Sequence, residues 1–210
     1  MYIPSSDGES DRDKLLDFVA RYPFATVVTP AAGELWVSHL PLLARRRADR
    51  VVLLGHVARA NPHWQAFERG ATTAIFHGPH AYVSPTWYAK APAVPTWNYA
   101  VVHATGQVRV VRAEDDGAFV AARVRELTEV FEGQGEGGGA WSPSALPEDF
   151  ATKKLQAIVG FELAVDRFEG KFKLGQHRSE EDRRGVIARL EGVTSDTSRA
   201  LAALMRQTLD

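Results

Sequence analysis

One strand-to-helix turn of this chain carries side chains of the types that bind phosphate. In the segment GHVARANPHW, residues 55–64, His56, Arg59 and Asn61 stand between a β-rich run and a helix start. A guanidinium offers a bidentate fork to an oxyanion, and backbone N–H groups are unpaired where a helix begins. The segment therefore predicts a phosphate-binding turn. The competing interpretation is a plain turn in which Asn61 caps the helix, because Asn-Pro is a common helix start.

The charge pattern around this turn also favours an anion. No Asp or Glu occurs between Arg69 and Ala113, whereas that window holds four Lys or Arg residues and three histidines. Six of the seven histidines lie between His39 and His103. A single histidine is more often a satisfied core residue. The whole set, however, favours a binding site for an anion such as phosphate.

A loop rich in aromatic residues follows, YVSPTWYAKAPAVPTWNY from Tyr82 to Tyr99, and it contains no acid. Its Trp and Tyr rings suit a flat apolar platform, and Lys90 suits the polar edge of a bound ring. A charged anchor and an aromatic platform together fit a phosphorylated planar cofactor. The alternative is packing against a dimer partner, since aromatic residues are also enriched at interfaces.

Metal and dinucleotide sites are weaker interpretations. The pair His77-x-x-His80 has no carboxylate near it in sequence, and metal sites commonly add one or use one to orient the imidazoles. We therefore predict no metal site. The loop GQGEGGG, residues 133–139, matches GxGxxG, but it follows a predicted helix where a dinucleotide fingerprint needs a strand, so we reject it.

Composition narrows the class of protein. A net charge of −1 and a pI near 6.7 provide no global basic field for nucleic acid or an anionic membrane. The absence of cysteine excludes disulfides, thiolate catalysis and zinc-thiolate sites, and it favours the cytoplasm. The start MYIPSSDGES does not read as a signal peptide, and no apolar run is long enough for a membrane span.

Short strands interrupted by helices must position these residues, which predicts an α+β fold built on a small β-barrel with helical additions. The polar stretch Arg45 to Arg50 is interpreted as a turn. We predict helices over 10–22, 61–67, 115–131, 148–157, 181–190 and 197–208. We predict strands over 24–29, 35–40, 51–57, 72–76, 101–111 and 158–168.

Motifs along the chain resemble those of the PaiB family of FMN-binding negative transcriptional regulators, in order from Met1 to about Leu190. The motifs are MYIP, SHLPLL, GHVARANPHW, FHGPHAYVSPTWY, VPTWNYAVVHATG, IVGFEL and EGKFKLGQHR. This family is similar to the FMN-binding split β-barrels, whose best-known member is pyridoxamine-phosphate oxidase. The resemblance implies a homodimer with FMN in the cleft between subunits.

The resemblance also implies a domain division and a set of site residues. An FMN-binding split-barrel domain is expected over residues 1–170, and a C-terminal helical extension over 171–210, packed on the barrel or on the dimer partner. The phosphate would be held by Ser38, His39, His56, Arg59 and Asn61. The ring or the partner subunit would be approached by Trp87, Lys90, Thr96, Trp97 and Asn98.

One motif departs from the family pattern. The late motif commonly reads KxKLSQN, and this chain has Gly175 and His177 where relatives have Ser and Asn, while Lys173 and Gln176 remain. Any ligand or nucleic-acid contact by that Ser and Asn is therefore in doubt. The best helix-turn-helix candidate, residues 181–208, mixes its arginines with acids, so we expect no tight sequence-specific DNA binding by this chain alone.

These observations leave three function hypotheses. The first is a flavin-dependent sensor or transcriptional regulator, with a possible DNA or protein partner. The second is an FMN-dependent oxidoreductase, such as a flavin reductase or a pyridoxamine-type oxidase. The third is a haem-handling split barrel with one of the clustered histidines as axial ligand. The middle region offers no obvious proton-transfer acid, so no catalytic residue is assigned.

Overall fold

The computed structural model describes residues 1–134 and 141–209. The predicted loop over 133–139 therefore lies outside the described residues from residue 135 onward. The strands are β1 Gly8–Glu9, β2 Phe24–Ala31, β3 Glu34–Pro41, β4 Leu43–Arg47, β5 Arg50–Ala58, β6 Thr72–Val83, β7 Thr96–Arg112 and β8 Ile158–Lys173. The helices are α1 Arg12–Arg21, α2 His63–Ala66, α3 Ala113–Gln134, α4 Glu148–Gln156, α5 Glu180–Glu191 and α6 Asp196–Arg206.

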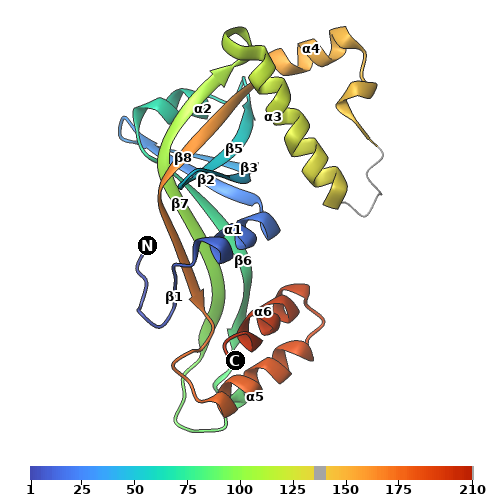
Figure 1. Ribbon diagram of the computed structural model, residues 1–210. Coiled ribbons are helices and arrows are strands. Elements are labelled where there is room, and N and C mark those ends of the chain that lie inside the picture. The colour runs from blue at the N-terminus through green and yellow to red at the C-terminus, as the bar shows by residue number, and fades with distance from the viewer. Residues whose placement is uncertain (135–140, 210) are drawn as a thin grey trace. The chain divides into compact units, whose positions relative to one another are not determined.

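The strands form one sheet in the order β3-β2-β6-β7-β8-β5-β4, and β1 pairs with β8 (Figure 1). The pairings of β2 with β3, β4 with β5 and β5 with β8 are antiparallel. Helices precede, interrupt and follow this sheet along the chain. The predicted α+β class is confirmed.

The chain divides into two compact units. The first comprises Met1–Phe18, Phe76–His103 and Phe168–Asp210, and the second comprises Val19–Ile75 and Ala104–Arg167. The long strands β6, β7 and β8 each contribute residues to both units. The two units do not coincide with the predicted split-barrel domain (1–170) and C-terminal extension (171–210). That domain division stays a prediction.

The second unit has a core built by strand alternation. In β2, Ala25, Val27, Thr29 and Ala31 are buried while their neighbours are more exposed, as period-two packing requires. Helix α3 covers another face of the same unit. There Leu127 packs with Leu43, Val52 and Leu54, the buried residues of β4 and β5.

The first unit is organised around its C-terminal helices. Helices α5 and α6 pack on each other and on the ends of β6 and β8 (Figure 1). The shared cluster consists of Ala81, Val83, Leu174, Val186, Ile187, Leu190, Leu201, Ala202 and Met205. Ser179 caps α5 by accepting from the Asp182 backbone N–H. Buried Asp182 in turn accepts from the backbone N–H groups of Ala89 at 2.8 Å and Lys90 at 3.3 Å, which anchors the aromatic loop.

Several predicted elements differ from the observed ones. The predicted polar turn Arg45 to Arg50 is too long, because residues 43–47 form strand β4 and the turn itself is limited to Ala48 and Asp49. An edge strand tolerates charged side chains, and Arg45 and Arg47 reach Glu126 and Glu162. Strands β6, β7 and β8 extend beyond their predicted ends, so the two ends of the aromatic loop are strand. Among the described residues, no helix combines the length and the apolar character needed to cross a membrane.

Candidate functional site

A buried cluster of hydroxyl, imidazole and amide groups lies in the second unit, where β2, β3 and the turn before α2 meet. Ser38 Oγ lies 2.8 Å from His63 Nδ1 and accepts a hydrogen bond from Asn61 Nδ2 at 3.0 Å. His63 Nε2 lies 2.9 Å from Thr29 Oγ1, which lies 2.7 Å from Thr72 Oγ1. The structure thus brings together two predicted phosphate-site residues, Ser38 and Asn61.

His63 holds this cluster together, and the sequence analysis did not single it out. Its side chain is 1% exposed, and its ring packs 4.6 Å from the Phe67 ring. Burial lowers the pKa of His63, because a charged imidazole loses its hydration there. A neutral ring is one donor and one acceptor, so both nitrogens are satisfied by hydroxyls. The only sequence signal was its place in the turn motif, since its hydroxyl partners lie 25 and 34 residues away.

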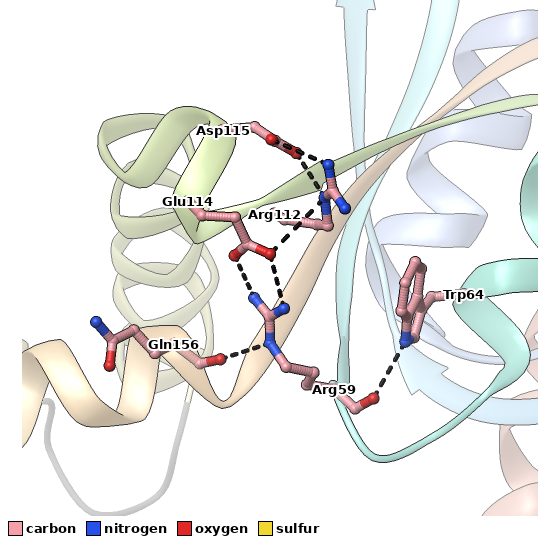
Figure 2. A network of polar contacts seen from close by, with 6 residues as sticks. All are labelled: Arg59, Trp64, Arg112, Glu114, Asp115 and Gln156. Carbon is pink, nitrogen blue, oxygen red and sulfur yellow. Dashed lines mark hydrogen bonds and ion pairs between the residues drawn. The ribbon is translucent and has the colours of Figure 1, made fainter.

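Arg59 lies in the same turn but points to a different partner (Figure 2). Its Nη1 and Nη2 donate to the two carboxylate oxygens of Glu114 at 2.8 and 2.5 Å, and Nε donates to the Gln156 carbonyl at 2.7 Å. This hydrogen bonding lowers the pKa of Glu114 to about 2 and raises the pKa of Arg59. The guanidinium therefore presents the bidentate geometry that suits an oxyanion, and a carboxylate already occupies it.

The other two predicted phosphate ligands lie elsewhere in the second unit. His39 follows Ser38 on β3, so its side chain is on the opposite face of the strand, where Nδ1 is 3.3 Å from Thr26 Oγ1. His56 belongs to β5, and it lines a cavity beside α3. The predicted set is therefore distributed over four places, and Ser38 and Asn61 are the pair in direct contact.

Helix α2 is shorter than the predicted 61–67. It spans His63–Ala66, and the chain continues as a short 3₁₀ turn over Phe67–Arg69. Asn61 Oδ1 accepts from the His63 backbone N–H at 3.0 Å, which is the capping role weighed for it. One helical turn adds little dipole, so anion binding here depends on side chains more than on the helix.

The first unit carries the exposed aromatic surface. Trp97 on β7 is 55% exposed, and its ring centroid lies 6.2 Å from that of Tyr82 and 6.3 Å from that of His80. A cavity of about 350 Å³ is lined by His77, His80, Trp97 and Tyr99 among others. These side chains lie on strands and not on a loop, so they form a rigid aromatic surface of β6 and β7.

The remaining predicted ring contacts have internal roles. Asn98 is 2% exposed, and its Nδ2 lies 3.6 Å from Met205 Sδ. Thr96 Oγ1 accepts from Lys173 Nζ at 2.6 Å. Trp87 is half-buried against the α5–α6 cluster, whereas Lys90 is exposed. Of this group, Trp97 and Lys90 are the most accessible to a ligand.

The altered late motif has a structural explanation at one position. Gly175 has φ +80°, a left-handed conformation that glycine adopts without steric cost. The Gln176 side chain closes the same turn by accepting from Leu174 N at 2.8 Å and donating to the Phe172 carbonyl at 2.6 Å. Gly175 and Gln176 therefore shape the turn that leads into α5.

The histidine pair His77 and His80 does not assemble a metal-binding group with other residues. His80 Nδ1 lies 3.2 Å from the Gly78 carbonyl oxygen, which favours the tautomer with Nε2 unprotonated. Within residues 1–134 and 141–209, no group of three or more His, Cys, Asp or Glu residues is placed to hold a metal ion. The expectation of no metal site stays a prediction.

Comparison with solved structures identifies the class of fold. The structure is similar to the flavocytochrome Anf3 from Azotobacter vinelandii, with a TM-score of 0.62 at 19% identity, covering 84% of this chain and 74% of that one. It is also similar to the FAD and heme binding protein from Mycobacterium smegmatis, with a TM-score of 0.57 at 17% identity, covering 80% and 74%. The fold is the flavoprotein split barrel, as predicted.

Sequence comparison identifies the family. The family model described as "Putative FMN-binding domain" matches residues 1–167. The protein named protease synthase and sporulation protein PAI 2 from Bacillus subtilis is 32% identical over 210 residues, covering 100% of this chain and 98% of that protein. The chain therefore belongs to this FMN-binding family, the PaiB type suggested by its motifs, and FMN is its cofactor.

Proposed function

We propose that this protein is an FMN-dependent sensor and transcriptional regulator of the PaiB type, acting as a homodimer in the cytoplasm. The observation that carries the proposal is the turn after β5, where the Arg59 guanidinium binds the Glu114 carboxylate in the bidentate geometry that also suits a phosphate. The family relationship supplies the cofactor, and the full-length likeness to PAI 2 supports the regulatory role.

The chemistry of the donor set fits FMN. Arg59 and Asn61 would hold the phosphate, with Ser38 orienting the Asn61 amide through the buried cluster. The exposed rings of Trp97 and Tyr82 belong to the first unit, where they form a flat apolar surface of their own. FMN would supply hydride and single-electron transfer, while Arg59 and Asn61 would hold its phosphate.

The first prediction concerns the phosphate. Replacing Arg59 with alanine should weaken FMN binding by about 10- to 150-fold, because a charge-assisted fork is lost, and should leave riboflavin binding nearly unchanged. Isothermal titration of both ligands measures this. Equal losses for FMN and riboflavin would remove the phosphate assignment.

Glu114 provides the matched variant. If the phosphate uses the Arg59 fork, Glu114 competes with it, so Glu114→Gln should leave FMN affinity unchanged or improve it. A purely structural Arg59–Glu114 pair makes the opposite prediction, in which both variants reduce the melting temperature together and neither changes the preference for FMN over riboflavin.

The second prediction is the homodimer. Trp97, Tyr82 and Val94 are 55%, 46% and 68% exposed in one chain, more apolar area than a monomer usually leaves in water. Sedimentation at micromolar concentration should give twice the 23.1 kDa of one chain. Trp97→Glu should shift the protein toward monomer, whereas Trp141→Glu, at a residue 48% exposed in the other unit, should not. A wild-type monomer with full flavin affinity would refute the dimer.

The third prediction concerns DNA. Three of the five arginines of α5 and α6 pair with nearby acids: Arg184 with Glu180, Arg199 with Asp196, and Arg206 with Glu191. The patch at Arg45 and Arg47 is paired with Glu126 and Glu162. Specific readers usually present a free basic face, so we expect regulation through a protein partner.

Binding assays on genomic fragments at physiological salt, with oxidised and with reduced flavin, check this expectation. Non-specific, strongly salt-dependent binding alone agrees with it. A sequence-specific complex at about 10⁻⁸ M or tighter, the usual range for dedicated regulators, would overturn it and establish direct repression.

An FMN-dependent oxidoreductase is the second candidate, because the exposed rings beside His77 and His80 leave room for a substrate on a bound flavin. A haem-handling role is the third, because His80 bonded to the Gly78 carbonyl has its Nε2 available as an axial ligand. The absorbance spectrum of the purified protein separates flavin from haem. Steady-state oxidation of a nicotinamide cofactor separates an oxidoreductase from a sensor.

A further inference from the structure

The guanidinium of Arg59 is engaged at each of its three nitrogens. Nη1 and Nη2 donate to the Glu114 carboxylate at 2.8 and 2.5 Å, and Nε donates to the Gln156 carbonyl at 2.7 Å (Figure 2). Carboxylate and phosphate both present two oxygens to a guanidinium fork. A phosphate that binds Arg59 in this way must therefore take the place of the Glu114 carboxylate.

The Arg59–Glu114 ion pair lies at the surface, where it can exchange partners. The Arg59 side chain is 35% exposed and that of Glu114 is 50% exposed. Such solvent-exposed pairs contribute little net stability. Hydrogen bonding by Arg59 lowers the pKa of Glu114 to about 2, so the carboxylate stays ionised in mild acid. Release of Glu114 from the fork therefore requires a competing anion and not a change of pH.

A second arginine lies close enough to receive the displaced carboxylate. Arg112 Nε is 3.8 Å from Glu114 Oε1, and the Arg112 guanidinium binds Asp115 at 2.6 and 3.0 Å. Three carboxylates already act on the two guanidiniums through their charge, those of Glu114, Asp115 and Glu68. A phosphate bound beside Glu114 would add to this excess of negative charge. Movement of Glu114 from Arg59 toward Arg112 removes that conflict.

The backbone of α3 allows Glu114 to move. Asp116 has φ −154° and ψ 82°, which separates the first turn, residues 113–115, from the rest of the helix. Asp116 Oδ1 accepts from the Phe119 backbone N–H at 2.8 Å, so the longer segment begins with its own N-cap. A Cβ atom at Gly117, the next residue, would meet no heavy atom within 4 Å. The turn that carries Glu114 can therefore rotate about Asp116 without unwinding the segment that follows.

We propose that Glu114 is a displaceable internal substitute for the flavin phosphate, which occupies the Arg59 fork in the flavin-free protein and moves toward Arg112 when FMN binds. The first turn of α3 moves with Glu114, so its position depends on whether a phosphate is bound. Riboflavin, which has no phosphate, leaves Glu114 in the fork. This inference rests on the proposed role of Arg59 in holding the phosphate and adds a residue that regulates that site.

Isothermal titration of the flavin-free protein with FMN and riboflavin tests the competition. Glu114→Gln keeps the shape of the side chain and removes its charge. FMN should then bind about three- to sixfold more tightly, and riboflavin affinity should not change. Asp115→Asn is the control, because it removes the same charge from the same turn but leaves the Arg59 fork occupied. It should change FMN affinity by less than about twofold, and equal gains in both variants would overturn the proposal.

Carbon-13 NMR of protein labelled at the glutamate carboxyl groups follows Glu114 directly, and the Glu114→Gln spectrum identifies its signal. In the flavin-free protein and with riboflavin, Glu114 should stay ionised from neutral pH down to about pH 3.5, because Arg59 lowers its pKa. With FMN bound, loss of the Arg59 partner should raise the pKa of Glu114 toward its ordinary value of 4.5. An identical titration with and without FMN would show that Glu114 stays in the fork.

These measurements separate the displacement of Glu114 from the assignment of the phosphate to Arg59. Suppose that Arg59→Ala weakens FMN but not riboflavin, while Glu114→Gln changes neither affinity. Arg59 then holds the phosphate, and the displacement is wrong. If Arg59→Ala weakens both ligands equally, the phosphate assignment fails and the inference fails with it. Thermal unfolding verifies that each variant is folded.

Discussion

Replacing Gly106 with alanine should prevent the chain from folding to a soluble protein. A Cβ atom at this position of β7 would lie 1.8 Å from the carbonyl oxygen and 2.8 Å from the carbonyl carbon of Ala164 on β8. Both are backbone atoms, so no side-chain rotation relieves the overlap, and the two strands would have to separate. We expect a loss of more than about 4 kcal/mol, an exceptional value for one methyl group.

Soluble yield and thermal unfolding measure this effect, and Gly117→Ala in α3 is the control. A Cβ at Gly117 meets no heavy atom within 4 Å. Asp116 has a non-helical backbone, so Gly117 begins the longer segment of α3, and alanine there should be close to neutral. A Gly106→Ala protein that melts within a few degrees of wild type would mean that β7 and β8 do not approach as closely as the structure shows.

Replacing His63 with leucine should lower the free energy of unfolding by about 3 kcal/mol. Two buried hydrogen bonds disappear, to Ser38 and Thr29, and the contact with the Phe67 ring changes. The loss is smaller than if both hydroxyls were left without partners, because Thr29 is still hydrogen-bonded to Thr72 and Ser38 to Asn61. A cycle with Ser38→Ala should be non-additive by at least about 0.5 kcal/mol, since the two residues share one bond.

The pH dependence of stability separates this role from simple packing. The pKa of His63 is about 6.5 in the unfolded chain and is lowered in the folded protein. Between these two values the unfolded state binds more protons, so stability is complete above about pH 7 and falls as the pH decreases through 6.5. The slope is at most about 1.4 kcal/mol per pH unit for each such histidine.

Urea unfolding between pH 8 and pH 5 measures that slope. His63→Leu should remove the contribution of His63 to the slope. The contribution of His56, whose pKa is also lowered by burial, should remain. A variant with an unchanged slope would show that His63 is not held neutral, and an unchanged stability at pH 8 would show that the cluster does not support the fold.

The pattern of neighbouring residues in the sequence predicted much of the fold. Runs rich in β-forming residues identified the strands that bury Val27 and Leu53, and the turn motif at 55–64 lies between a strand and a helix as predicted. These features need only neighbouring residues, because side-chain direction repeats every two residues in a strand. Strand ends were less predictable, since whether β6 continues past Phe76 depends on the strand paired beside it.

For the candidate site, the sequence predicted the residue types but few of their contacts. Residue types predicted a phosphate-binding turn, and family membership supports its cofactor. The hydrogen-bond partners could not be predicted from neighbouring residues, because Arg59 bonds Glu114, 55 residues away in sequence, and His63 bonds Thr29, 34 residues away. Ser38 and His39 are adjacent in sequence, yet they point to opposite faces of β3, one into the buried cluster and one toward Thr26.

The amino-acid sequence by itself determined the chemistry available to this protein: no thiol, a central window without acids, and one arginine-bearing turn. Tertiary structure decided which of those groups are free and which are occupied. It paired Arg59 with Glu114, made His63 the centre of a buried cluster and buried His56 Nδ1 without a hydrogen-bond partner among the described residues. The physical reason is that hydrogen bonds and burial depend on distance in space, and folding brings together residues that composition and spacing leave unrelated.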